Sequence, residues 1–188
     1  IFIGLLPGSR PREIRKLLPL FLETARLLGN GKNGFLFVVP VAHTGYETPV
    51  REILGRYKDV QAVAAGRFTP ADIASFDAVL ASSGTATLET ALVGRPTVIA
   101  YRANPLTFAI GRRLVKSKWI GMPNILLGDE LFPEFLQGRA RPDSLADALR
   151  RALEKDAERA AGFRKVREIL RPMESYRAVA KVLVTGAR

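Results

Sequence analysis

Residues 81–102 read ASSGTATLETALVGRPTVIAYR, and this stretch decides the fold that we expect. An apolar run ends in a turn of small residues, a helical segment follows as far as Gly94, and a second apolar run begins at Pro96. This order is typical of a βαβ unit with a parallel pair of strands. The turn also holds several hydroxyls and is followed by a single carboxylate, Glu89, a composition that suggests a ligand as well as a turn.

The same alternation continues on both sides of this unit. Short, almost entirely apolar runs predict strands at residues 1–6, 35–41, 60–64, 78–81 and 96–101. Spacing and start signals predict helices at residues 11–28, 46–57, 85–93, 106–115, 130–137, 144–153, 157–170 and 176–184, with a short one opened by Thr69 and Pro70. Strands that are apolar throughout suit a sheet covered on both faces. The expected fold class is therefore α/β, a Rossmann-like parallel sheet with helices on both faces.

Arg171 and Pro172 interrupt the helical pattern near the end of the chain. We expect residues 1–171 to form one Rossmann-like domain, a length that supports a single hydrophobic core. Residues 172–188 are expected to form a C-terminal helix that packs elsewhere. Because the chain begins at Ile1, inside an expected strand, we also expect it to be a piece of a longer protein.

Composition excludes several kinds of site. The 188 residues contain no cysteine and one histidine, His43, which rules out disulfides, thiolate metal sites and histidine-rich metal sites. No apolar run is long enough to cross a membrane. The net charge of +11 indicates either a solvated basic surface or an anionic partner. The aromatic residues lie within apolar runs and not among Lys and Arg, so we expect no nucleic-acid partner.

The first candidate site is the turn in LLPGSRPREI, after the first expected strand. Gly8 allows the backbone to pass close to a ligand, and Ser9 can cap the next helix or donate to an oxygen. Arg10 places a guanidinium at a helix N-terminus, which suits a phosphate or diphosphate. The turn matches neither the P-loop nor the GxGxxG pattern. A capped turn with a solvated arginine explains the same residues without a ligand.

The second candidate site is the helix start within SSGTATLE. Ser83, Gly84 and Thr85 can present N–H and hydroxyl donors to phosphate oxygens. Glu89 lies four residues after Thr85 and therefore faces the same way. Its carboxylate can accept hydrogen bonds from vicinal hydroxyls, as an acidic residue does for ribose in dinucleotide-binding folds. A helix N-terminus with a favourably placed carboxylate is the alternative without a ligand.

Three further polar residues are weaker candidates. Asn124 follows Pro123 in an expected loop, where its amide can either read a base or sugar or organise the turn. Glu134 and Gln137 are expected on one face of a helix, where such a pair is usually solvated. His43 follows the second expected strand, and we expect a structural or solvated role for it.

Four segments, taken in order and spacing, resemble a known family. They are LLPGSRPREIRKLLP (residues 5–19), ASSGTATLETALVGRPTVIAYR (81–102), PLTFAIGRRLVK (105–116) and PNILLGDELFPEFLQ (123–137). By these segments the chain resembles the C-terminal half of bacterial lipid-A-disaccharide synthases over about residues 3–137. These are inverting glycosyltransferases of GT-B architecture, with two Rossmann-like domains.

The resemblance implies an activity and a set of site residues. The family transfers 2,3-diacylglucosamine from UDP-2,3-diacylglucosamine to 2,3-diacylglucosamine 1-phosphate and releases UDP. By resemblance, Gly8, Ser9 and Arg10 lie near the diphosphate, Ser83, Gly84 and Thr85 near the phosphates, and Glu89 at the ribose. Asn124, Glu134 and Gln137 match positions facing the donor, and uracil is expected at the backbone of residues 66–68.

The resemblance also implies what this chain lacks. The general base and most acceptor contacts are expected on a missing N-terminal domain, to which the last helix crosses, so no catalytic residue is assigned here. No metal or other cofactor is implied. The parent enzyme is expected in the cytoplasm, in peripheral contact with the anionic surface of the inner membrane, and a homodimer is left open.

Two rival interpretations use the same turns. A UDP-N-acetylglucosamine 2-epimerase would need the same phosphate turn and ribose carboxylate, and would turn over a free UDP-sugar without a lipid acceptor. A non-catalytic module would bind a nucleotide or an anionic lipid and do no chemistry. Selective binding of UDP over uridine and over anionic vesicles separates these alternatives.

Overall fold

The computed structural model describes residues 1–29, 34–41, 44–66, 69–102, 117–154 and 157–170. The expected helix at residues 106–115, the C-terminal helix within residues 172–188 and His43 lie outside these ranges, as do residues 67–68 of the expected uracil site. Of the helices that are described, none is long and apolar enough to span a membrane.

A parallel sheet forms the centre of the molecule. Its strands are β1 (Phe2–Leu6), β2 (Leu36–Pro40), β3 (Ala62–Ala65), β4 (Ala78–Ala81), β5 (Thr97–Tyr101) and β6 (Glu134–Leu136). They lie in the order β3-β2-β1-β4-β5-β6, and all five neighbouring pairs are parallel. This is the strand order of a doubly wound, Rossmann-like sheet.

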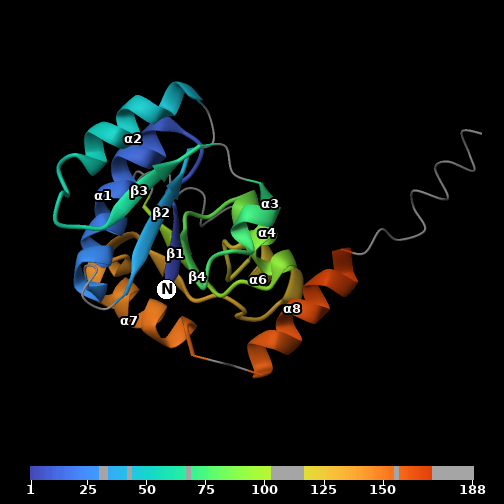
Figure 1. The fold of residues 1–188 in the computed structure, drawn as a ribbon. Helices are drawn as coiled ribbons and strands as arrows, with labels where there is room; N and C mark the ends of the chain where they lie inside the picture. Colours follow the sequence, from blue (N-terminus) through green and yellow to red (C-terminus); the bar gives the residue numbers. More distant parts are fainter. Residues whose placement is uncertain (30–33, 42–43, 67–68, 103–116, 155–156, 171–188) are drawn as a thin grey trace, which may run out of the picture.

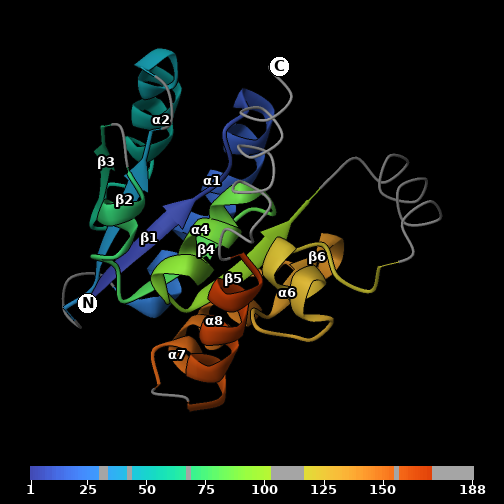
Figure 2. The same cartoon turned by 90° about the vertical axis from the view of Figure 1, so that its right-hand side faces the viewer.

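Helices cover both faces of the sheet, as Figures 1 and 2 show. One face carries α1 (Pro11–Leu28), α2 (Glu47–Leu54) and α7 (Pro142–Ala152), and the other carries α3 (Pro70–Ile73), α4 (Thr85–Val93), α6 (Met122–Leu127) and α8 (Ala157–Leu170). Two 3-10 turns, η1 (Thr44–Tyr46) and η2 (Gln137–Arg139), complete the described elements. The expected fold class is confirmed.

The strands contribute side chains to three hydrophobic clusters on the two faces of the sheet, because successive side chains point to opposite faces. Ile3 and Leu5 are fully buried in the larger core beneath α1 and α7. Val79 and Ala81 of β4 pack with Phe76 in a smaller core on the other face. Burial on both faces accounts for the almost entirely apolar strands in the sequence.

Two local expectations are wrong. The residues expected to form a helix at 130–137 instead form the edge strand β6 and the turn η2. Pro133 directly precedes this strand, and pairing of residues 134–136 with β5 supplies backbone hydrogen bonds that replace helical ones. Asn124 lies in the short helix α6 and not in a loop, because Pro123 occupies an N-terminal helical position where its missing N–H costs nothing.

Gly4 is required for close packing on the smaller-core face of β1. A Cβ atom at Gly4 would lie 2.6 Å from two ring carbons of Phe76, which is itself 2% exposed. We expect Gly4→Ala to lower the free energy of unfolding by about 1–3 kcal/mol in chemical denaturation, because the ring has no room to retreat. Gly138→Ala is the control, since no atom lies within 4 Å of its added Cβ. Equal stability of the two variants would contradict this account.

Candidate functional site

The two predicted turns begin side by side at one edge of the sheet. β1 and β4 are neighbours, with Leu6 in register with Ala81, and the Ser82 amide donates to the Leu6 carbonyl at 2.8 Å. The helix after β1 lies on one face of the sheet and the helix after β4 on the other. This arrangement is a topological switch point, the place where open α/β sheets bind ligands beyond the carboxyl ends of their strands.

The first turn leaves the start of α1 uncovered by any side-chain cap. Gly8 has a φ of 109°, and a Cβ there would lie 2.3 Å from Oε2 of Glu13. Arg10, not Ser9, is the N-cap residue, and it forms no side-chain cap hydrogen bond. The Arg10 side chain is 81% exposed, with its Nη1 atom 3.7 Å from Oε1 of Glu13. The helix N-terminus and the guanidinium are therefore both available to an anion.

Glu13 is a residue of this turn that the sequence analysis did not single out. It lies in the first turn of α1, and its side chain is 27% exposed and covers Gly8. A carboxylate at a helix N-terminus is favourable for the helix, but it competes with any anionic ligand at the same place. Its spacing of three residues from Arg10 was the available sequence signal.

The second turn resembles the first in its exposed helix start. Gly84 is the N-cap residue of α4 and provides no side-chain cap, and Gly84 and Thr85 are both exposed. The Ser83 hydroxyl donates to the Ile120 carbonyl at 2.9 Å. Glu89 is half-buried one turn further along α4, and among the described residues no ion pair involves it. Two uncapped helix N-termini thus start from adjacent strands.

Asn124 and Glu134 are brought together, although not on one helical face. Asn124 is fully buried, and its Nδ2 atom donates to Oε1 of Glu134 at 2.9 Å. Glu134 is the first residue of β6, and its carboxylate also accepts hydrogen bonds from the backbone of Ile120 and Gly121. The polar atoms of both side chains are therefore engaged within the chain.

Gln137 lies immediately after β6, at the same carboxyl edge of the sheet as the two turns. Its φ is 52°, and among the described residues it is the one non-glycine with a positive φ. Such a conformation is costly for a residue with a Cβ and is found preferentially at functional sites. The backbone therefore singles out one of the residues that the sequence predicted for this edge.

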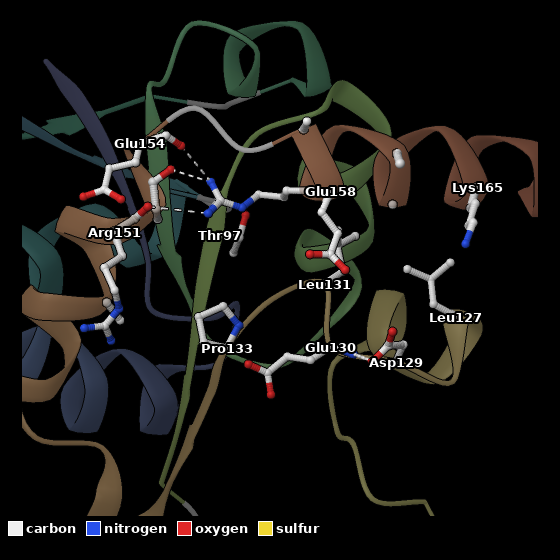
Figure 3. Close-up of a pocket in the computed structure, with 16 residues that line it drawn as sticks. Thr97, Leu127, Asp129, Glu130, Leu131, Pro133, Arg151, Glu154, Glu158 and Lys165 are labelled. Atoms are coloured by element: carbon white, nitrogen blue, oxygen red, sulfur yellow. Dashed lines mark hydrogen bonds between the residues drawn. The ribbon is translucent and has the colours of Figure 1, made fainter.

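A pocket of 790 Å³ lies at the opposite edge of the sheet (Figure 3). Thr97 at the start of β5 and Pro133 before β6 line it, with side chains of α7 and α8. Arg159 donates there to the carbonyl of Ala152, the last residue of α7, at 2.7 Å and to that of Glu154, just beyond the helix, at 3.4 Å. Its guanidinium thus satisfies backbone carbonyls, and the pocket is separate from the switch point. No group of three or more potential metal ligands occurs within the described ranges.

Comparison with known proteins agrees with this architecture. The model of the lipid-A-disaccharide synthetase family matches residues 1–183. The lipid-A-disaccharide synthase of Azotobacter vinelandii is 42% identical over 188 residues, covering 99% of this chain and 50% of the relative. That of Pseudomonas fluorescens is 39% identical over 181 residues, covering 96% and 48%. The chain therefore spans about half the length of the curated relatives that it matches.

Solved structures share the fold at low sequence identity. An S. aureus TarM mutant in complex with fondaparinux, alpha-GlcNAc-glycerol and UDP has a TM-score of 0.56 at 15% identity, over 98% of this chain and 34% of that one. The catalytic domain of cholesterol-alpha-glucosyltransferase from Helicobacter pylori also has a TM-score of 0.56 at 15% identity, over 89% and 96%. Because the family model matches residues 1–183 of the 188, this chain belongs to the lipid-A-disaccharide synthetase family.

Proposed function

We propose that this chain is the nucleotide-sugar-binding half of an inverting glycosyltransferase. The whole enzyme would transfer 2,3-diacylglucosamine from UDP-2,3-diacylglucosamine to 2,3-diacylglucosamine 1-phosphate, forming the lipid A disaccharide and releasing UDP. The observation that carries this proposal is the pairing of β1 with β4, which starts two uncapped helices from one edge of the sheet. Membership of the family supports the choice of substrates.

The roles follow from the charge of each group. The Arg10 guanidinium, the positive N-terminal end of α1 and the first amides of α4 would bind the diphosphate, with the backbone of Ser83, Gly84 and Thr85 closest to it. The Glu89 carboxylate would accept hydrogen bonds from the ribose hydroxyls. As the glycosidic bond breaks, negative charge grows on the UDP leaving group, and these fixed donors would stabilise it.

The remaining chemistry belongs to the other half of the enzyme. A general base must take the proton from the acceptor hydroxyl, and we place that base and the acyl-chain contacts on the N-terminal half. We also propose that the whole enzyme works at the cytoplasmic side of an anionic membrane surface. The net charge of +11 supports this, because a basic protein is attracted to acidic headgroups.

Binding of UDP tests the site directly. We expect Arg10→Ala and Glu89→Ala each to weaken UDP binding roughly tenfold in calorimetry, the loss of one charge-assisted contact. Arg56→Ala and Glu52→Ala are matched controls, since both residues are exposed, lie in or just after α2, and are outside the switch point. The site is refuted if wild-type protein binds UDP no better than uridine, or if Arg10→Ala and Glu89→Ala bind UDP as tightly as wild type does.

Glu13 predicts an effect of the opposite sign. We expect Glu13→Gln to tighten UDP binding roughly two- to fivefold at low salt, because it removes a carboxylate from the helix start that would receive the diphosphate. Added salt should reduce the gain, since screening weakens the repulsion. Uridine lacks the diphosphate and is the control ligand, so a gain of equal size for uridine would count against this interpretation.

Catalysis should require the missing half. We expect the purified 188-residue chain to release no UDP from UDP-2,3-diacylglucosamine, with or without 2,3-diacylglucosamine 1-phosphate, because it carries no proposed base. Mass spectrometry of the lipid products provides the measurement. Formation of the disaccharide by this chain alone would disprove the placement of the general base on the N-terminal half. Consumption of a UDP-sugar without an acceptor would favour the epimerase alternative.

A further inference from the structure

Glu134 accepts hydrogen bonds from three donors at the start of α6. Its Oε2 atom lies 2.9 Å from the Ile120 amide, and its Oε1 atom lies 2.8 Å from the Gly121 amide and 2.9 Å from Nδ2 of Asn124. Gly121 is the N-cap residue of α6, so the carboxylate neutralises the amides that lead into that helix. The Glu134 side chain of β6 thereby holds residues 120–121, which lead into α6 on the face of the sheet.

Asn124 completes the attachment from inside the helix. Its Oδ1 atom accepts hydrogen bonds from the amides of Leu131 and Phe132, each at 2.9 Å, and its Nδ2 atom donates to the Phe132 carbonyl at 2.7 Å. The side chain is fully buried, and all of its hydrogen-bonding capacity is used. Asn124 therefore joins α6 to the segment that leads into β6, and has no polar atom left for a sugar.

The network reaches the candidate site through a single residue. The Ile120 amide is bound to Glu134, while the Ile120 carbonyl accepts the hydroxyl proton of Ser83 at 2.9 Å. Ser83 directly precedes Gly84, the N-cap residue of α4. Ile120 therefore links the Glu134 network to the residue that precedes the N-cap of α4, and the hydroxyl proton of Ser83 is already donated.

Close packing at Gly121 supports the same account. A Cβ atom at Gly121 would lie 2.4 Å from Cδ1 of Ile99 and 3.0 Å from Oε1 of Glu134. The backbone before α6 is thus pressed against β5 and the carboxylate at once. Such close approach is typical of a segment whose position is determined by its surroundings.

From this geometry we infer that Glu134 and Asn124 are positioning residues of the UDP site, and not contacts of the transferred sugar. This inference rests on the proposed function. Glu134 and Asn124 hold Ile120 in place, and Ile120 holds Ser83. Ser83 in turn precedes the amides at the start of α4, where we propose that the diphosphate binds. The charge of Glu134 is essential to this task. Glu134→Gln keeps the shape but turns an N–H donor toward amides that are donors themselves.

The test combines amide hydrogen exchange with calorimetry on the 188-residue chain. We expect Glu134→Gln to speed exchange of the Ile120 and Gly121 amides at least tenfold, to speed exchange across residues 82–85, and to weaken UDP binding roughly three- to tenfold. Ser83→Ala should speed exchange across residues 82–85 alone and weaken UDP binding to a similar extent. The double variant should bind UDP no more weakly than Glu134→Gln, because both changes break one chain of contacts.

UDP separates positioning from sugar contact, because it carries no sugar. If Glu134→Gln weakens binding of the UDP-sugar while UDP binding and exchange across residues 82–85 stay as in wild type, the inference is overturned. Should Glu134→Gln fail to fold, Ser83→Ala decides: unchanged exchange across residues 82–85 overturns the inference, and faster exchange supports it.

If wild-type protein binds no UDP, the proposed function fails while the exchange measurements still report on the network. If Arg10→Ala weakens UDP binding but Glu134→Gln changes neither UDP binding nor amide exchange, the positioning inference is overturned and the proposed function stands.

Discussion

The pairing of β1 with β4 is the constraint on which the rest of this structure depends. Because the chain leaves these two neighbouring strands toward opposite faces, the first turns of α1 and α4 diverge from one edge and expose their amides there. Neither helix start has a side-chain cap, so the first-turn N–H groups that lack an intrahelical partner are left to a ligand or to water. The fold itself thus builds a place for negative charge before any specific side chain contributes.

The side chains at this edge adjust the binding place that the backbone creates. Arg10 adds an exposed positive charge, and Glu13 in the same turn opposes it. Three carboxylates then have three different tasks: Glu13 moderates the helix start, Glu134 is committed to backbone amides, and Glu89 has no ion pair within the described part of the chain. Among the described residues, a carboxylate with no ion pair is the one suited to the hydroxyls of a ligand, whereas one that already accepts hydrogen bonds from three donors is suited to holding a backbone segment.

Membership of the family gives the half-length chain a natural context. An open parallel sheet binds its ligand beyond the carboxyl ends of its strands, and the pocket at the opposite edge is lined here by side chains of α7 and α8. A second domain facing the switch point would enclose the ligand and exclude water, which strengthens every charged contact within the site. The proposed division into a nucleotide-holding half and an acceptor-holding half is compatible with this geometry.

The sequence by itself determined the sheet, most of its helices and the positions of the two strand-to-helix turns, because those features are local. Strands buried on both faces are apolar throughout, and α1 places its apolar residues on one face. Only the tertiary structure decided that residues 134–136 form a strand, since three residues carry no periodicity and pair with β5, more than thirty positions earlier. The same holds for Asn124 and Glu134: their partners lie in segments that the fold brings together, and no spacing in the sequence encodes which amides a buried carboxylate will meet.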